Sequence, residues 1–192
     1  MRSMKIRSPG KIRPNLKQLE KKLKVKIELK SGILIFSGEE LDEYIAEKVF
    51  EAIDLGFSTR VALLLIEEDY LLELISIKSN IKKNPALTRA RIIGTKRKTL
   101  DTLESLSNCF IALHENTLGV IGHVEDVKGV IQALSSVIRG AKVANVYAYL
   151  EKLNRERKPF ILDLKKPGKG KTEAEEIERL EENENLNEIT DE

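Results

Sequence analysis

The chain carries one stretch twice, and the second copy reads GTKRKTLDTLESLSNCFIALHENTLGVIGHVEDVKGVIQALSSVIRG from Gly94 to Gly140. The first copy runs from Gly10 to Gly56 at a constant offset, 94 − 10 = 84, and needs no gap. The residues shared by both copies are Gly10, Arg13, Leu16, Leu19, Glu20, Ile27, Leu29, Gly38, Asp42 and Gly56, which recur as Gly94, Arg97, Leu100, Leu103, Glu104, Ile111, Leu113, Gly122, Asp126 and Gly140. Two helices of similar pattern would share leucines but not glycines in register. The sequence therefore predicts one module of roughly 75–85 residues used twice.

Composition limits the class of protein. The 192 residues fit two small domains and a tail. Charged residues make up 33% and aromatic residues 5%, which predicts a soluble protein with aliphatic cores. No apolar run approaches the roughly 20 residues of a membrane helix, and the N-terminus lacks a signal peptide. The single cysteine, Cys109, excludes an internal disulfide and a cysteine-based zinc cluster. We therefore expect a cytoplasmic protein.

The net charge of +2 conceals an asymmetry along the chain. Residues 172–192 hold ten acidic residues and one basic residue, Arg179, for a charge of −9, so the remainder carries +11. A basic body with an acidic tail is typical of a protein that binds a polyanion. A charged surface of the thermophile type would give a similar composition, so charge alone leaves both interpretations open.

Hydrophobic periodicity predicts the elements of the second copy. An aliphatic strand is expected over 70–78 and a short helix over 86–93, with Pro85 at its start and Gly94 breaking it. Further elements are expected as a helix over 98–107, strands over 110–113 and 118–121, a helix from 124 to Gly140, and a helix over 143–157. The order is strand, helix, glycine turn, helix, strand, strand, helix.

The first copy repeats the later part of this order. The pattern predicts a helix over 15–23, strands over 25–29 and 33–36, a helix over 40–55 and a connecting helix over 58–67. Only nine residues precede Gly10, too few for a full strand and a full helix. We expect the first module to be shortened.

The segment Arg91-Ile92-Ile93-Gly94-Thr95-Lys96-Arg97-Lys98-Thr99 resembles the R-I-I-G-x-x-G-K-T segment of archaeal tandem KH proteins. These proteins are relatives of the eukaryotic partner-of-Nob, or Dim-type, assembly factors of the small ribosomal subunit. Supporting matches lie at 83–89, 56–58, 62–63, 69–70, 140–141 and 146–151, so the resemblance covers roughly residues 5–158. It implies an α+β fold of two tandem type I KH modules, each a three-stranded antiparallel sheet packed on helices. The implied domains are 1–68, 69–158 and a tail over 159–192.

Glycines between two helices let the backbone approach a nucleic-acid strand, with helix N-terminal amides facing phosphate. The adjoining groove holds about four single-stranded nucleotides, and we expect Ile92 and Ile93 to pack there. The implied RNA-binding residues are Arg91, Ile92, Ile93, Gly94, Thr95, Lys96, Arg97 and Lys98. Arg97 replaces the second glycine of the motif. If this position needs positive φ, arginine costs on the order of 1 kcal/mol or changes the turn. If the glycine only allows close approach, the arginine side chain blocks some of that contact.

The first loop, Gly10-Lys11-Ile12-Arg13, also lacks its second glycine and is followed by Pro14. Secondary RNA contacts are expected from Gly10, Lys11, Arg13, Arg155, Arg157 and Lys158. The last three are alternatively explained as cations near a helix C-terminus, where they are favourable in any case.

Nothing in the sequence indicates an enzyme. His114 and His123 have no neighbouring nucleophile or metal-ligand spacing, there is no phosphate-binding loop, and no cofactor or metal is expected. Cys109 takes the place of Val25 in the first copy, which predicts a small buried apolar residue.

The resemblance implies a non-catalytic factor that clamps single-stranded rRNA near the 3′ end of the small-subunit RNA during its maturation. Its implied partners are a Nob-type endonuclease and the α-subunit of translation initiation factor two. Two alternatives stay open: a KH-fold scaffold for protein interactions with weakened RNA binding, and a general RNA-binding regulator. Residues 165–171 are interpreted as a flexible basic linker and 172–192 as a disordered solubilising tail, with competition between this acidic tail and RNA for the basic body as the alternative.

Overall fold

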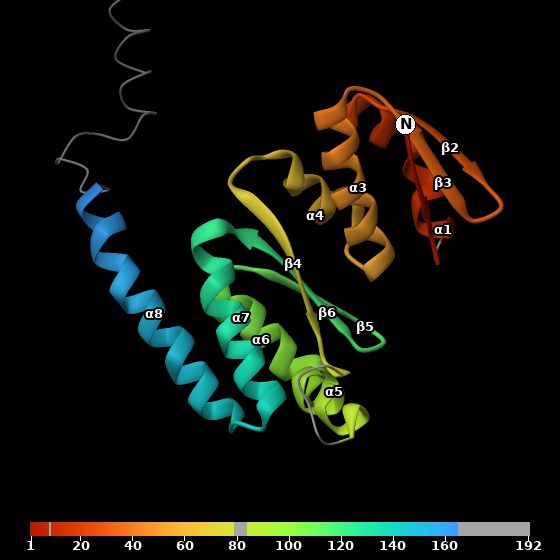
Figure 1. The fold of residues 1–192 in the computed structure, drawn as a ribbon. Helices are drawn as coiled ribbons and strands as arrows, with labels where there is room; N and C mark the ends of the chain where they lie inside the picture. Colours follow the sequence, from red (N-terminus) through yellow and green to blue (C-terminus); the bar gives the residue numbers. More distant parts are fainter. Residues whose placement is uncertain (8, 79–83, 165–192) are drawn as a thin grey trace, which may run out of the picture. The chain divides into compact units, whose positions relative to one another are not determined.

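In the computed structural model, residues 1–7, 9–78 and 84–164 are described, and they form an α+β fold (Figure 1). Among these residues, the strands form two three-stranded antiparallel sheets. Residues 1–154 make up one compact unit and residues 155–192 a second one. The expected linker and acidic tail over 165–192 lie outside the described residues. In the described part of the chain, no helix has the length and apolar character needed to cross a membrane.

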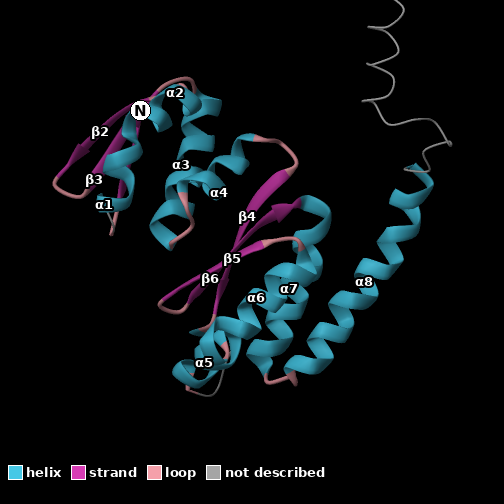
Figure 2. Cartoon of the chain, turned by 180° about the vertical axis from the view of Figure 1, so that it is seen from behind, coloured by secondary structure: helices cyan, strands magenta, loops and turns pink. Residues whose placement is uncertain are grey.

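The first half of the chain folds around the sheet β1-β3-β2 (Figure 2). Its elements are β1 (Arg2–Lys5), α1 (Pro9–Ile12), the 3₁₀ turn η1 (Arg13–Asn15), α2 (Leu16–Leu23), β2 (Lys26–Lys30), β3 (Ile33–Ser37) and α3 (Glu40–Leu55). The predicted connecting helix over 58–67 is wrong as one helix, because α4 (Thr59–Ala62) is followed by the 3₁₀ turn η2 (Leu63–Ile66). The short β1 and α1 agree with the expected shortening of this half.

The second half folds around the sheet β4-β6-β5, which has the same strand order. Its elements are β4 (Tyr70–Ser76), α5 (Pro85–Ile93), the 3₁₀ turn η4 (Thr95–Arg97), α6 (Lys98–Ser107), β5 (Phe110–His114), β6 (Thr117–His123), α7 (Val124–Arg139) and α8 (Val143–Leu164). The sequence predicted α8 to end at residue 157. It continues instead through Pro159.

The backbone repeats at the same offset as the sequence. Helices α3 and α7 begin and end 84 residues apart, and each stops at a glycine of positive φ, 122° at Gly56 and 109° at Gly140. Left-handed residues recur as well, Lys24 with Asn108 and Ser31 with Glu115. The backbone conformation of the stretch from α2 to the end of α3 therefore recurs in the stretch from α6 to the end of α7.

Two side-chain contacts also occur once in each copy. Oε1 of Glu20 accepts a hydrogen bond from the Ile27 amide at 2.9 Å, and Oε1 of Glu104 accepts from the Ile111 amide at 2.7 Å. The second contact packs a glycine against a small apolar side chain: a Cβ on Gly38 would lie 2.9 Å from Val25, and one on Gly122 would lie 2.4 Å from Cys109. Cys109 is buried, as its equivalence to Val25 predicted.

The central strand of the second sheet, β6, is buried on both faces, unlike β3 in the first sheet. Five consecutive residues of β6, from Leu118 to Gly122, are buried, whereas buried and accessible residues alternate along β3. One face of β6 carries the core beneath α5, α6 and α7, and the other receives Leu55 and Phe57 from the end of α3. Gly119 provides the space, because a Cβ there would lie 2.1 Å from Leu55 Cδ2. The two halves therefore share part of their core.

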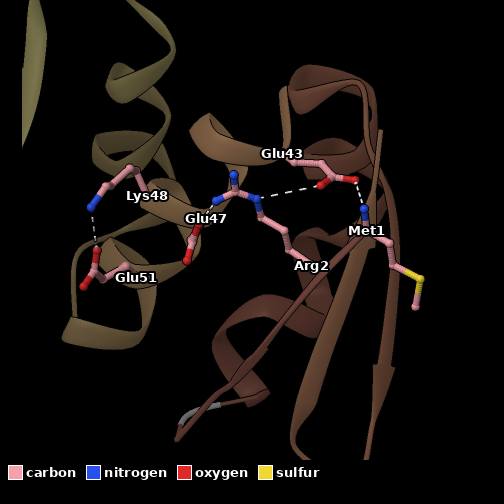
Figure 3. Close-up of polar contacts among 6 residues, drawn as sticks. All are labelled: Met1, Arg2, Glu43, Glu47, Lys48 and Glu51. Carbon is pink, nitrogen blue, oxygen red and sulfur yellow. Dashed lines mark hydrogen bonds and ion pairs between the residues drawn. The ribbon is translucent and has the colours of Figure 1, made fainter. Parts of the chain in front are cut away.

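Helix α3 carries a cluster of ion pairs near the N-terminus (Figure 3). The buried Glu43 carboxylate accepts from the Met1 ammonium at 2.6 Å and from the Gly38 amide at 3.1 Å. Arg2 bridges Glu43 and Glu47. The Met1 ammonium and the Gly38 amide both favour the ionised form, and they lower the pKa of Glu43.

Candidate nucleic-acid interface

The turn between α5 and α6 is built around Gly94. Helix α5 begins at a capped turn, where Oδ1 of Asn84 accepts from the Ala86 amide at 2.9 Å, and it ends at Gly94. Gly94 has φ 70° and ψ 174°, a conformation that residues with a side chain rarely adopt. A Cβ at this position would also lie 2.1 Å from Thr99 Oγ1. Glycine is therefore required here both by conformation and by space.

Two non-glycine residues of positive φ follow. Lys96 has φ 51° and Arg97 has φ 66°, and α6 begins at the next residue. The position where the motif has its second glycine thus does need a left-handed backbone, and arginine carries the associated cost, on the order of 1 kcal/mol. The left-handed backbone is present at this position with arginine in place of glycine.

The Arg97 side chain points back along α6. Its Nε donates to Asp101 Oδ1 at 2.9 Å, and Nη2 lies 3.5 Å from Glu104 Oε2. Two carboxylates therefore compete with a phosphate for this guanidinium. Sequence reasoning missed Asp101 and Glu104, although an acid four residues after an arginine on a helix is a readable signal.

Lys96 and Lys98 are exposed beside an open hollow of about 750 Å³. Its lining combines two lysines and three hydroxyl groups with one carboxylate and one apolar side chain: Thr95, Lys96, Lys98, Asp101, Thr102, Ser105 and Leu106. The hollow lies against the first turns of α6, where helix N-terminal amides favour anions. This is the surface where the expected loop residues gather.

Three other predicted residues have different surroundings. Nη2 of Arg91 donates to the carbonyl oxygens of Gly140, at 3.4 Å, and Ala141, at 2.7 Å, and so caps the C-terminus of α7. Ile92 is 0% exposed and belongs to the core, so the expectation that it packs in the groove is wrong. Ile93 is 38% exposed and remains accessible.

The first loop does not form the same turn. Gly10 lies inside α1 without a positive φ, and Ile12 is buried in the first core. Lys11 and Arg13 are exposed, but the chain passes from α1 through η1 into α2 without a left-handed residue. The loop expected over Gly10–Arg13 is therefore wrong, because α1 and the start of η1 occupy these residues.

The remaining expected contacts lie on α8. Arg155 is exposed and begins the second unit of the chain. Arg157 and Lys158 belong to the same helix, and their side chains fall outside the described ones.

A second hollow, of about 250 Å³, lies where β5 and α6 face the first half of the chain. Arg97, Glu104 and residues 110–113 line one side, and Leu55, Gly56, Phe57, Ser58 and Val61 line the other. Sequence reasoning gave no role to Phe57, because its partner strand is distant in the chain.

These features define a class. A sheet of order β4-β6-β5, covered by three helices with a glycine turn between the first two, is the arrangement of a type I KH domain. Residues 71–155 match the family of eukaryotic-type KH domains (KH domain type I) that represents the second KH domain of PNO1. The chain is thus a KH-domain protein.

Similarity extends beyond that domain. A KH domain-containing protein of Methanocaldococcus jannaschii is 29% identical over 169 residues, covering 84% of this chain and 73% of the relative. The crystal structure of Dim2p from Pyrococcus horikoshii is 27% identical with a TM-score of 0.72, covering 79% of this chain and 98% of that one. Residues 71–155 thus match a type I KH domain, and the chain is similar to KH proteins of the Dim2/PNO1 type.

Two further structures are similar. One is the a/eIF2alpha-aDim2p-rRNA complex from Pyrococcus horikoshii, matched with 27% identity and a TM-score of 0.72 over 81% of this chain and 94% of that one. A protein of unknown function from Aeropyrum pernix is 23% identical with a TM-score of 0.75 over 85% of this chain and 95% of that one, and it shares the fold.

Proposed function

We propose that this protein is a non-catalytic RNA-binding factor that holds single-stranded rRNA near its 3′ end during maturation of the small ribosomal subunit. The observation that carries the proposal is the turn from Gly94 to Arg97, which keeps its left-handed backbone despite the loss of the second glycine. A module that kept the fold but bound no ligand would not need that strained backbone conformation. The first copy does without it.

In the proposed clamp, the backbone of residues 94–96 approaches the phosphates, and Lys96 and Lys98 supply charge beside the 750 Å³ hollow. Ile93 offers an accessible apolar surface for a base. The Arg97 guanidinium binds a phosphate only when its ion pairs with Asp101 and Glu104 are broken. Gly10, Lys11, Arg13, Arg155, Arg157 and Lys158 remain proposed secondary contacts.

Residues 1–68 are proposed to be a shortened KH module, followed by the KH module of residues 69–158 and a tail over 159–192. Support for the first module comes from its identical strand order and the repeated Glu20–Ile27 contact. The first module would keep the fold without the nucleic-acid turn.

The proposed partners follow from the relatives. The Pyrococcus horikoshii complex contains a/eIF2alpha and rRNA together with aDim2p, so we propose the α-subunit of initiation factor two and rRNA as partners of this chain. A Nob-type endonuclease is proposed from the resemblance and would perform the cleavage that this protein does not. The role would place the protein in the cytoplasm, with the assembling ribosomes.

Binding to a single-stranded oligonucleotide from the rRNA 3′ end tests the proposal, with a scrambled oligonucleotide at two salt concentrations as comparison. We expect preference for the rRNA sequence at both salt concentrations. Equal, strongly salt-sensitive binding to both oligonucleotides would support a general RNA-binding regulator instead.

The protein-interaction scaffold remains the second candidate. It is favoured by the first loop, where Gly10 is helical, and by the two carboxylates that hold Arg97. It predicts weak RNA binding that is indifferent to the charge of Lys96.

A further inference from the structure

Strand β4 lies at the outer side of the second sheet and pairs with β6 alone among the described strands (Figure 2). It is seven residues long, and the edge of such a strand presents backbone groups that another chain can pair with. Proteins usually protect edges of this kind with short strands, prolines or bulges. None of these devices occurs within Tyr70–Ser76.

Two hydrogen bonds at the ends of β4 show which of its residues direct their backbone N–H and C=O groups away from β6. The Val124 amide donates to Asp69 O at 2.9 Å, and the Ile77 amide donates to Asn116 O at 2.7 Å. Odd-numbered residues of β4 therefore exchange hydrogen bonds with β6, because such pairs alternate along an antiparallel ladder. The even-numbered residues of β4 direct their N–H and C=O groups away from β6.

The outward residues are Leu72 and Leu74 in the middle of the strand. Tyr70 also points outward, but its amide already donates to Glu67 O at 3.1 Å. The amides and carbonyls of Leu72 and Leu74 are thus oriented to receive a neighbouring strand.

A groove of about 500 Å³ runs beside this edge. Its lining combines aliphatic side chains with two tyrosines and the charged Lys48 and Glu73: Tyr44, Ile45, Lys48, Leu65, Tyr70, Leu71, Leu72, Glu73 and Leu74. Tyr44 is 51% exposed and Leu74 41%, so both offer apolar surface that the described residues leave uncovered. Side chains of an added strand that lie opposite Leu72 and Leu74 would enter this groove.

Every charged residue from Glu67 to Glu73 is acidic. Glu73 is exposed between the two leucines, on the opposite face of the sheet. Glu67, Glu68 and Asp69 are exposed just before the strand. Lys48, the one basic residue in the lining, lies 3.4 Å from Glu51.

We propose that the edge of β4 binds an extended segment of a partner protein in which apolar and basic residues alternate. The segment adds a fourth strand to the sheet, with apolar side chains opposite Leu72 and Leu74 and a lysine or arginine opposite Glu73. The proposal concerns a surface distinct from the nucleic-acid turn and does not depend on the proposed function.

The same charges disfavour the other occupants. In a symmetric pairing with a second copy of this chain, Glu73 would face the equivalent acidic edge, and like charges across a strand pair are destabilising. The RNA backbone is negatively charged, so the carboxylates of Glu67, Glu68, Asp69 and Glu73 would repel it.

The test uses a fluorescein-labelled nine-residue peptide of alternating valine and lysine, titrated with the full-length protein and followed by anisotropy. Two control peptides are used. One has valine alternating with glutamate, and the other is the valine–lysine peptide with a proline at its central position. Glu73→Lys is the test variant and Glu39→Lys its matched control, because both reverse the same charge on an exposed residue and Glu39 lies outside the groove lining and the acidic run of residues 67–73.

We expect binding of the valine–lysine peptide, no binding of either control peptide, and at least a tenfold loss for Glu73→Lys against less than a threefold loss for Glu39→Lys. Amide hydrogen exchange at Leu72 and Leu74 should slow when the peptide is added. Equal losses for the two variants, equal binding of the proline peptide, unchanged exchange, or displacement of the peptide by a second copy or by an RNA oligonucleotide would overturn the proposal.

Discussion

Gly94 and Gly10 occupy equivalent positions in the repeat but differ in backbone conformation. Gly94 has a φ of 70° and lies against Thr99, whereas Gly10 lies inside α1, where an added Cβ would meet nothing within 4 Å. The same residue type is therefore required at one site and dispensable at the other. Substitution by alanine separates the two.

Gly94→Ala should destabilise the protein by about 1–3 kcal/mol, because the new side chain combines a disfavoured backbone conformation with a steric overlap. Gly10→Ala should leave stability unchanged or raise it by about 0.5–1 kcal/mol, the usual advantage of alanine over glycine in a helix. Urea unfolding of both variants measures the difference. Equal effects would show that the two turns are equivalent after all.

Asp101 restrains Arg97 at the other end of the turn. Asp101→Asn should raise affinity for single-stranded RNA about two- to fivefold at low salt, since an exposed ion pair is worth roughly 0.2–1 kcal/mol. Glu39→Gln removes one negative charge at an exposed site just before α3 and serves as the control. A gain that persists in the Arg97→Ala background would mean that Arg97 does not reach the RNA.

Among single residues, the sequence identified the segment of the site but not the role of every side chain. The resemblance located the turn at residues 91–99, yet Arg91 caps α7 and Ile92 is in the core. Contacts with Gly140 and Ala141 join positions about 50 residues apart, which periodicity does not reveal. The restraint on Arg97 by Asp101, by contrast, was local enough to be predicted.

Among the elements, α3 depends most clearly on pH. The pKa of Glu43 is lowered, so its contribution to stability is present above the pKa of the unfolded chain, about 4.3, and is lost as pH falls through the lower folded value. Acid should therefore weaken the attachment of the N-terminal residues to α3 (Figure 3).

Glu43→Gln should flatten the fall in unfolding free energy between about pH 5 and about pH 3 relative to the unmodified protein. Urea unfolding across that range makes the comparison. Glu39→Gln, on an exposed residue just before α3, is the control and should keep the full pH dependence. An unchanged slope in Glu43→Gln would assign the acid sensitivity to other carboxylates.

Elements with a clear period and a clear stop were predictable from the sequence. Helices α3 and α6 have their predicted bounds, and α7 ends at Gly140 as expected. Prediction was poorer where the signal was weak or tertiary. The apolar run of 58–67 gave one helix where a 3₁₀ turn intervenes, and Pro159 suggested a boundary that α8 crosses. The structure of the first copy before α2 could not be inferred from the second copy, because α1 and η1 replace the glycine turn there.

For the whole molecule, the shared core implies that both sheets unfold together. Ile121 of β6 belongs to the hydrophobic cluster of the first half, and Leu55 and Phe57 lie against Gly119. Phe57→Ala should lower the free energy of unfolding by about 3–5 kcal/mol. In a urea titration the variant should still unfold in one transition, at a lower urea concentration.

Gly119→Ala tests the same contact from the other side. It should cost about 1–3 kcal/mol through overpacking, and Leu55→Ala in the same chain should recover part of the loss by making room. Strictly additive costs in the double variant would place Leu55 away from Gly119.

The fold thus repeats while its glycine turn does not, and we propose that only the second turn holds RNA. The decisive comparison is between Lys96→Glu and Lys11→Glu in binding to the rRNA 3′-end oligonucleotide across salt concentrations. Both variants reverse one exposed lysine, in the second and the first turn respectively. We predict that Lys96→Glu lowers affinity at least about tenfold and reduces the salt slope by about one, while Lys11→Glu stays within about twofold. Equal losses in both variants, or no loss in Lys96→Glu, would show that the second turn has no special role in holding RNA.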